Sequence, residues 1–384
     1  MKKAMIYGLG ISGTGAKELL EKEGYETIVV DDKKAMTSEE ALNHLDGLEF
    51  FIKSPGIPYN DFVKEVQKRG IKILDEIEIA YNYMIEKGLK TKIIAITGTN
   101  GKSTTTAKIS DMLNHAGYKA AYAGNIGRSL SEVLLKEKDL DFISLELSSF
   151  QLENVENFKP YISMIINMGP DHIERYKSFD EYYDTKFNIT KNQTEDLYFI
   201  ENIDDVEIEK RAKQVKAKRI SVSKFKKADI FVENDKICHG KDSIIDVDKL
   251  SLKGIHNLEN TLFMVATAEI LKLDREKLKE FLMIATPLEH RTELFFNYGK
   301  LKFINDSKAT NVDSTKFAIE ANKNSILICG GYDKGVDLAP LAEMIKKNIK
   351  EVYLIGVIAD KIEDELKKLG YEDNKIHKLV NIEN

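Results

Sequence analysis

Short apolar runs alternate with amphipathic stretches along the whole chain, and this alternation predicts the secondary structure. At the N-terminus the apolar residues 4–7 lead into a glycine-rich turn, a helical pattern as far as Glu23, and a strand-like run over 27–30. This order is typical of a β-α-β unit. Two further strands are expected at 49–52 and 71–74. Together these elements predict a small α/β domain that is followed by a polar linker.

A second region begins with the β-branched strand 93–96, a glycine-rich turn and a helix that ends near His115. Apolar runs of the buried type follow at 142–145 and 162–166. We therefore expect a mostly parallel sheet with helices on both faces. Residues 197–252 are rich in turns and predict peripheral strands. Helical patterns then close the region, at 257–271 and 275–284.

The third region alternates in the same way and predicts a second open α/β sheet. Its expected strands lie at 301–304, 325–329, 351–355 and 376–380. The sequence stops where another helix and strand would be expected, so we predict that this domain is shortened. The predicted fold is α/β with three domains, which cover residues 1–89, 90–287 and 288–384.

The composition agrees with a multidomain globular protein. The chain has 384 residues, more than one hydrophobic core usually serves, and 42% of them are hydrophobic. The formal charge of -6 comes from acidic and basic residues mixed along the chain, which indicates no nucleic-acid partner. No stretch is long and apolar enough to span a membrane. Cys238 and Cys329 form no CxxC pair, so we expect a reducing cytoplasm and no zinc site.

The first turn carries a nucleotide-binding pattern. Gly8-x-Gly10-x-x-Gly13 follows a strand, and Asp31 closes the next strand. Such glycines let the backbone approach a pyrophosphate at the start of a helix. The pattern predicts a nucleotide or a sugar nucleotide without saying which. A turn with no ligand, or an NAD-dependent oxidoreductase, would show the same pattern.

The turn of the second region is a stronger signal, because backbone N–H groups, a lysine and hydroxyl groups arrive together at the start of a helix. Its residues are Gly98, Thr99, Asn100, Gly101, Lys102, Ser103 and Thr104. The turn departs from the usual phosphate-loop pattern, since Ile96 stands in place of the first glycine. We expect it to bind the β- and γ-phosphates of ATP together with Mg²⁺.

Polar residues also follow two other strands of the second region. Glu146 ends a buried strand, where a magnesium-binding carboxylate would stand, one strand away from the phosphate loop. Asp171 and His172 follow the strand 162–166 and would reach the same sheet edge, where doubly wound proteins bind ligands. Without a ligand, Glu146 would be a solvated strand end and His172 a structural histidine.

Two turns of the third region place a lysine at the carboxyl end of a strand. They run from Asn305 to Asn311, with Lys308, and from Gly330 to Gly335, with Lys334. Either could be an ordinary turn. The two together suggest a second face that closes on the nucleotide.

Taken in order, these motifs resemble the Mur ligase family, from the first strand to about Lys334. The specific elements are 8–13, Ser54-Pro55-Gly56-Ile57, 98–104, Gly124-Asn125-Ile126-Gly127, 146–153, Asp171-His172, His290-Arg291 and 305–311. The resemblance implies a Rossmann-like first domain that binds UDP rather than a dinucleotide. It also implies a central ATPase domain of the P-loop type and a Rossmann-like C-terminal domain.

The resemblance assigns roles to single residues. It implies that Lys102 holds the γ-phosphate, and that Ser103 and Glu146 ligate one Mg²⁺. His172 and a carbamylated Lys186 would ligate a second Mg²⁺, because a carbamate supplies negative oxygen where an ammonium would be repelled. The other implied contacts are Ile11, Ser12, Asp31 and Asp32 for UDP; Asn125, Ser148 and Gln151 for muramoyl-alanine; Asn257, Asn260, Arg291 and Asp306 for ATP; and Lys308, Thr310 and Lys334 for the amino acid.

The implied activity is an ATP-dependent carbon–nitrogen ligation that joins D-glutamate to UDP-N-acetylmuramoyl-L-alanine through an acyl phosphate, in peptidoglycan synthesis. The family's third domain normally continues into a Ser-Pro-Ala segment with a following Asp-x-Phe, which does not occur before Asn384. Two alternatives therefore stay open: a Mur-type ligase with a different amino-acid acceptor, and an inactive nucleotide-binding relative. We expect a monomer that binds only small molecules.

Overall fold

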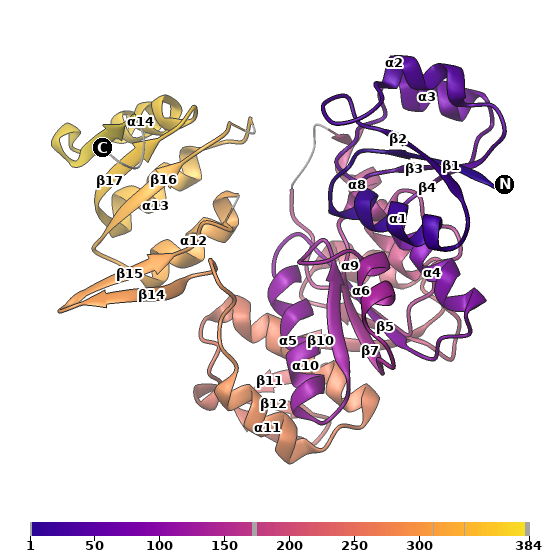
Figure 1. The fold of residues 1–384 in the computed structure, drawn as a ribbon. Helices are drawn as coiled ribbons and strands as arrows, with labels where there is room; N and C mark the ends of the chain where they lie inside the picture. Colours follow the sequence, from indigo (N-terminus) through magenta and orange to yellow (C-terminus); the bar gives the residue numbers. More distant parts are fainter. Residues whose placement is uncertain (1, 171–174, 310, 334, 381–384) are drawn as a thin grey trace. The chain divides into compact units, whose positions relative to one another are not determined.

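The structure is a computed structural model that describes residues 2–170, 175–309, 311–333 and 335–380. The chain forms two compact units, residues 1–285 and 286–384 (Figure 1). Both contain parallel strands covered by helices, which confirms the predicted α/β class. In the described part of the chain, no helix is long and apolar enough to cross a membrane.

The first unit begins with a four-stranded parallel sheet in the order β2-β1-β3-β4. Strand β1 lies inside this sheet, and its residues Met5 and Ile6, which point to opposite faces, are both wholly buried. The strands are β1 Lys3–Tyr7, β2 Glu26–Val30, β3 Leu48–Lys53 and β4 Ile73–Leu74, and the helices are α1 Ile11–Lys22, α2 Ser38–Ala41, α3 Asp61–Lys68 and α4 Glu76–Glu86.

A nine-stranded sheet follows, in the order β13-β12-β11-β10-β9-β8-β5-β7-β6. It is parallel except for β12 and β13, which add an antiparallel edge where peripheral strands were predicted. Strand β6 was missed because it is short and has no β-branched residue. The strands are β5 Lys92–Thr97, β6 Ala120–Gly124, β7 Phe142–Glu146, β8 Ile162–Ile165, β9 Tyr198–Asn202, β10 Lys218–Ser223, β11 Ile230–Glu233, β12 Lys236–His239 and β13 Asp242–Asp246.

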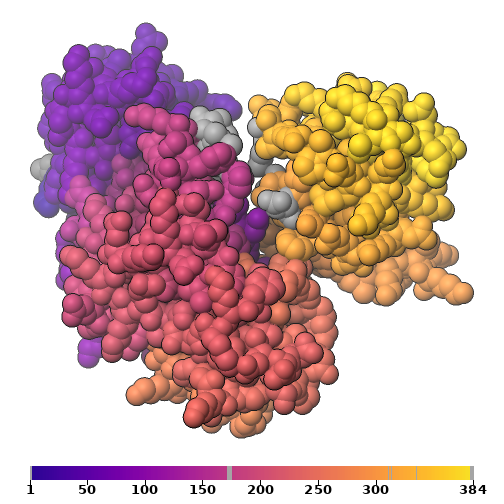
Figure 2. Space-filling model, turned by 180° about the vertical axis from the view of Figure 1, so that it is seen from behind, coloured from indigo at the N-terminus to yellow at the C-terminus, as the bar shows by residue number. Residues whose placement is uncertain are grey.

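The helices of this region are α5 Lys102–His115, α6 Leu130–Lys136, α7 Ser149–Leu152, α8 Phe179–Phe187, α9 Val206–Ala212, α10 Ile255–Leu271 and α11 Arg275–Ile284. Helices α5, α10 and α11 pack in one apolar cluster with the inner strands. A second cluster joins α1, α4 and α6 to both sheets, and contains Ile52 of β3 and Ile143 of β7. This cluster packs the two sheets together, and in the space-filling view the surface of the first unit is continuous (Figure 2). The predicted boundary at residues 89 and 90 falls between α4 and β5, and the three-domain division stays a prediction.

The second unit contains an antiparallel hairpin of β14 and β15 and a parallel sheet in the order β16-β17-β18. One prediction was wrong here, because residues 301–304 were expected in the open sheet and instead pair with the unpredicted β14. The apolar residues 294–296 do not alternate with polar ones, so they gave no strand signal. Gly299, with a φ of 59°, makes the tight turn. The elements are β14 Glu293–Tyr298, β15 Leu301–Asn305, α12 Val312–Ala321, β16 Ser325–Gly330, α13 Ala339–Asn348, β17 Ile349–Ile355, α14 Ala359–Lys368 and β18 Ile376–Leu379.

A buried carboxyl group lies where α4 meets α6. Glu76 is 1% exposed. Its Oε1 accepts a hydrogen bond from the backbone nitrogen of Ser131, at 2.6 Å. Its Oε2 has no hydrogen-bond partner among the described residues. Burial raises the pKa of Glu76 from 4.5 to about 7, because the charged form loses its hydration.

We expect Glu76 to make the stability of the protein depend on pH. Between the unfolded pKa of 4.5 and the folded pKa of about 7, the native state keeps a proton that the unfolded chain releases. The free energy of unfolding should therefore fall as the pH rises through this window, by up to about 3 kcal/mol. Urea unfolding on both sides of the window should show this fall in the wild type. The fall should be smaller in Glu76→Gln, and the buried neighbour Asp75, whose pKa burial also raises, should account for part of what remains.

The exposed Glu86, at the other end of α4, provides the matched control. Glu86→Gln should keep the pH dependence of the wild type. If Glu76→Gln also kept it, Glu76 would not be its source.

Candidate active site

The phosphate loop starts at the edge of the large sheet where the inner parallel strands end. Strand β5 lies between β7 and β8 and leads through residues 98–101 into α5. Gly98 and Gly101 have φ angles of 153° and 81°. A Cβ at Gly101 would lie 2.3 Å from Oδ1 of Asn260, so the loop needs glycine here for both conformation and space.

Two lysine side chains converge on one carbonyl oxygen of this loop. Nζ of Lys102 donates to the carbonyl oxygen of Gly98 at 2.9 Å and to that of Thr99 at 2.8 Å. Nζ of Lys186, from α8, donates to the same Gly98 oxygen at 3.0 Å. Lys186 is 2% exposed and lies 4.7 Å from the ring centre of Tyr182. The structure therefore brings two predicted site lysines together, Lys186 buried and Lys102 half-buried.

Glu146 lies beside the loop, as predicted, at the last position of β7. It pairs with Ile96 of β5, the strand that leads into the loop. The residue is 2% exposed, and its Oε1 accepts a hydrogen bond from Nδ2 of Asn125 at 2.9 Å. Oε2 is buried without a partner among the described residues. Such an oxygen is a suitable ligand for a cation.

The segment after β8 is fastened to the phosphate loop. The backbone nitrogen of Asn100 donates to Oδ1 of Asn167 at 2.8 Å, and that of Gly169 donates to Oγ1 of Thr99 at 2.9 Å. Nδ2 of Asn167 donates to Oε1 of Glu259 at 2.8 Å, on α10. Sequence analysis missed Glu259, although its position between two candidate asparagines was a usable signal. Glu259 therefore connects the phosphate loop to α10, the helix that carries two residues predicted to lie near the adenine of ATP.

Those candidates are Asn257 and Asn260 on α10. Nδ2 of Asn257 donates to the carbonyl oxygen of Lys253 at 2.8 Å, and Nδ2 of Asn260 lies 3.4 Å from Oδ1 of Asn257. Asn260 is 3% exposed and stands against Gly101. Asn260 thus lies next to the phosphate loop, and Asn257 contacts Asn260 and the segment just before the helix.

The glycine-rich turn of the first sheet is held by Asp31. Its Oδ2 accepts a hydrogen bond from the backbone nitrogen of Leu9 at 2.9 Å, which lowers the pKa of this carboxyl group. Asp32 accepts from the hydroxyl of Tyr7 at 2.9 Å. Ile11, at the start of α1, is 62% exposed, and Ser12 beside it is half-buried. Leu9 to Ser12 therefore form an ordered turn with an open apolar side chain.

Ser148 and Gln151 form a capping box at the start of α7. The backbone nitrogen of Ser148 donates to Oε1 of Gln151 at 3.0 Å, and the nitrogen of Gln151 donates to Oγ of Ser148 at 3.3 Å. Both side chains are therefore fixed by the helix end, at the carboxyl edge that also holds Glu146.

The remaining predicted residues divide between the second unit and undescribed positions. In the second unit, Asp306 accepts a hydrogen bond from the backbone nitrogen of Thr292 at 2.8 Å, and burial raises its pKa. The backbone nitrogen of Lys308 donates to the carbonyl oxygen of His290, beside Arg291, at 3.2 Å. The predicted residues Asp171, His172, Thr310 and Lys334 lie outside the described residues.

Residues 96–268 match the family model described as the Mur ligase middle domain. A UDP-N-acetylmuramoylalanine–D-glutamate ligase of Fusobacterium nucleatum subsp. nucleatum is 96% identical over 384 residues, which is all of this chain and 89% of that protein. The ligase of the same name from Natranaerobius thermophilus is 36% identical over 400 residues, which is 97% of this chain and 87% of that protein.

Solved structures agree on the fold. UDP-N-acetylmuramate-alanine ligase MurC of Thermotoga maritima gives a TM-score of 0.65 at 19% identity, over 99% of this chain and 90% of that chain. MurF of Acinetobacter baumannii gives 0.64 at 18% identity, over 83% of this chain and 78% of that chain. At these identities the likeness is one of architecture.

We expect Gly101→Ala to weaken ATP binding by at least about tenfold, because a Cβ in this left-handed conformation would force the loop away from Asn260. UDP binding, which sequence analysis assigns to the first sheet, should stay unchanged, since that sheet is untouched. Calorimetric titration with each nucleotide measures both. Gly117→Ala is the matched control, because Gly117 has a φ of 97° at the far end of α5, with only Nζ of Lys277 nearby, at 3.8 Å. Wild-type ATP affinity in Gly101→Ala would contradict the expectation.

Proposed function

The chain belongs to the Mur ligase family, and we propose that it joins D-glutamate to UDP-N-acetylmuramoyl-L-alanine in an ATP-dependent ligation of peptidoglycan synthesis. The observation that carries this proposal is the 96% identity, over the whole chain, to a ligase of that name. The candidate site supports it, because a phosphate loop, two lysines and a buried carboxylate lie at one sheet edge. The free thiols Cys238 and Cys329 suit the cytoplasm, where we place the reaction.

We divide the ligands among three domains. Residues 1–89 would bind UDP, residues 90–287 would bind ATP and the muramoyl-alanine part, and residues 288–384 would face the amino acid. The exposed Ile11 at the start of α1 supports the first of these assignments, since an apolar side chain there can lie against a nucleotide base. The proposed contacts are Ile11, Ser12, Asp31 and Asp32 for UDP; Asn125, Ser148 and Gln151 for muramoyl-alanine; Asn257, Asn260, Arg291 and Asp306 for ATP; and Lys308, Thr310 and Lys334 for D-glutamate.

In the proposed reaction the γ-phosphoryl group of ATP passes to the alanine carboxylate, which gives ADP and an acyl phosphate. The amine of D-glutamate then attacks the acyl carbon, phosphate leaves, and the nitrogen loses a proton. Lys102 would neutralise charge on the phosphoryl group as it moves. Its place at the first turn of α5, inside the phosphate loop, supports this role.

The residues around the loop fit a magnesium ion. Oε2 of Glu146 is buried without a partner among the described residues, and the hydroxyl of Ser103 belongs to the neighbouring helix start. No group of three His, Cys, Asp or Glu residues in the described chain could hold a metal alone. Phosphate oxygens and waters would therefore complete the shell, as Mg²⁺ usually requires. When bound, Mg²⁺ would offset negative charge on the phosphates. We assign His172 and Lys186 to a second ion.

The surroundings of Lys186 favour its proposed carbamate. Lys186 is 2% exposed, and its Nζ hydrogen-bonds the same Gly98 oxygen as Nζ of Lys102, so a carbamate there would replace two like charges with an opposite pair. A neutral amine can attack the carbon of CO₂ and release one proton, which leaves a carbamate with a single negative charge. The modified Lys186 would then place negatively charged carbamate oxygens beside the phosphate loop.

We expect the wild-type protein to form the amide and release phosphate when given ATP, Mg²⁺, UDP-N-acetylmuramoyl-L-alanine and D-glutamate. L-Alanine and a diamino acid, offered in place of D-glutamate, should give no product. Lys102→Ala should lower turnover by at least about a thousandfold, because the phosphoryl group loses its main protein cation. Chromatography of the product and a phosphate assay measure both. If the protein preferred another amino acid, D-glutamate would be the wrong acceptor.

We expect Lys186→Ala to lose at least about a hundredfold in turnover, because the site loses a preorganised negative group. Bicarbonate with a short carboxylic acid should partly restore it, since the acid can occupy the space of the carbamate. Lys186→Arg should stay inactive under the same treatment, because its guanidinium keeps the positive charge. Full turnover and ordinary magnesium dependence in Lys186→Ala would remove Lys186 from the site.

A further inference from the structure

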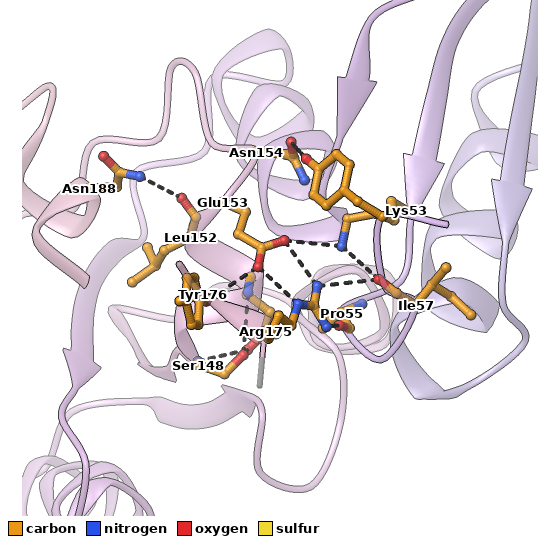
Figure 3. A network of polar contacts seen from close by, with 12 residues as sticks. Lys53, Pro55, Ile57, Ser148, Leu152, Glu153, Asn154, Arg175, Tyr176 and Asn188 are labelled. Carbon is orange, nitrogen blue, oxygen red and sulfur yellow. Dashed lines mark hydrogen bonds and ion pairs between the residues drawn. The ribbon is translucent and has the colours of Figure 1, made fainter. Parts of the chain in front are cut away.

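A buried ion cluster joins the carboxyl edges of the two sheets in the first unit (Figure 3). Oε2 of Glu153 lies 3.2 Å from Nζ of Lys53 and 3.0 Å from Nη2 of Arg175. Nε of Arg175 donates to the other carboxylate oxygen at 3.1 Å, so the guanidinium holds Glu153 with two bonds. One carboxylate from the large-sheet region thus binds a cation from the first sheet and a cation from its own region.

The cluster is largely shielded from water, and Arg175 also binds backbone oxygens. The side chain of Lys53 is 0% exposed, that of Glu153 is 11% exposed and that of Arg175 is 14% exposed. Arg175 also donates to the carbonyl oxygens of Pro55 at 2.6 Å and Ile57 at 3.2 Å. Buried charges gain little stability over apolar contacts of the same size. The bidentate guanidinium of Arg175 instead fixes the distance and direction between itself and the carboxylate of Glu153.

On one side the cluster is continuous with the proposed UDP site. Lys53 is the last residue of β3, and the next residue, Ser54, donates from Oγ to the carbonyl oxygen of Gly8 at 2.9 Å. Gly8 opens the glycine-rich turn that Asp31 holds from its other side. The position of this turn therefore depends on the residue that adjoins Lys53.

On the other side the cluster is continuous with the proposed acyl site. Glu153 directly follows α7, whose capping box is formed by Ser148 and Gln151. The guanidinium carbon of Arg175 lies 3.9 Å from the ring centre of Phe150 in the same helix. The hydroxyl of Tyr176 donates to Oε1 of Glu153 at 3.3 Å. The end of α7 is thus held from two directions by the cluster.

We propose that Lys53, Glu153 and Arg175 are positioning residues that set the spacing between the UDP end and the acyl end of the substrate site. This inference rests on the proposed function. A substrate that reaches both ends gains affinity only when their spacing matches its length, because the second end then binds within one complex. UDP alone touches the first end and gains nothing from the spacing. Loosening the cluster should therefore weaken the whole substrate and leave UDP unaffected.

The test compares two ligands on each variant, UDP and UDP-N-acetylmuramoyl-L-alanine, by calorimetric titration. Arg175→Lys keeps the charge but loses the fork that grips Glu153. It should bind UDP within about twofold of the wild type and the whole substrate at least about tenfold more weakly. In turnover, the KM for the UDP substrate should rise by the same factor while the KM for ATP stays unchanged. A role in stability alone would not separate the two ligands.

Tyr59→Phe gives a milder variant that keeps the proposal testable if Arg175→Lys does not fold. The Tyr59 hydroxyl donates to Oδ1 of Asn154 at 2.8 Å, and its ring lies 5.2 Å from Nζ of Lys53. Tyr59→Phe should also weaken binding of the whole substrate more than binding of UDP, but by a smaller factor than Arg175→Lys. The control is Lys72→Met, because the Lys72–Glu156 pair joins the same two regions at the surface, with side chains 48% and 43% exposed.

Lys72→Met should bind both ligands as the wild type does. Equal weakening of UDP and the whole substrate, or no weakening, in Arg175→Lys and Tyr59→Phe would overturn the spacing role. A wild type that binds UDP and the whole substrate equally and forms no amide would instead contradict the proposed function. The two failures are therefore distinguishable.

Discussion

Parallel strands bring their carboxyl ends to one edge of a sheet, and the centre of the candidate site depends on this constraint. Because β5 lies between β7 and β8, the residues that follow these strands become neighbours although they are far apart in the sequence. Gly98, Glu146 and Asn167 meet in this way. In the first sheet, β1 and β3 bring Gly8 and Ser54 together by the same rule. Side-chain contacts then refine positions that the topology has already chosen.

Charge at this edge is arranged for a ligand rather than for stability. Lys102 and Lys186 direct two ammonium groups at one carbonyl oxygen, while a carboxylate oxygen of Glu146 is buried without a partner among the described residues. Each feature is unfavourable in a folded protein by itself. Phosphate would neutralise Lys102, the proposed carbamate would reverse the charge of Lys186, and a divalent cation would pair with the carboxylate of Glu146. Like charges held close together and a buried oxygen without a partner are therefore expected where a ligand binds.

Much of this site could be read from the sequence, because phosphate binding needs glycines, a lysine and a hydroxyl in one short segment. Contacts between distant segments could not be read in this way. Arg175 and Lys53 give no local signal, since their shared partner Glu153 is close only after two sheets have packed together. The hairpin of β14 and β15 was missed for a different reason: its apolar residues 294–296 lack the alternation that marks a half-buried strand.

Two buried carboxylates show why an unpartnered oxygen must be interpreted from its surroundings. Glu76 and Glu146 each have one oxygen in a hydrogen bond and one buried oxygen without a partner among the described residues. Glu76 lies between α4 and the start of α6, where its burial raises the pKa to about 7 and protonation can satisfy it. Glu146 instead ends a strand beside the phosphate loop, where a metal ion and phosphate oxygens can reach it. A buried carboxylate oxygen without a hydrogen-bond partner therefore indicates a proton at Glu76 and a cation at Glu146.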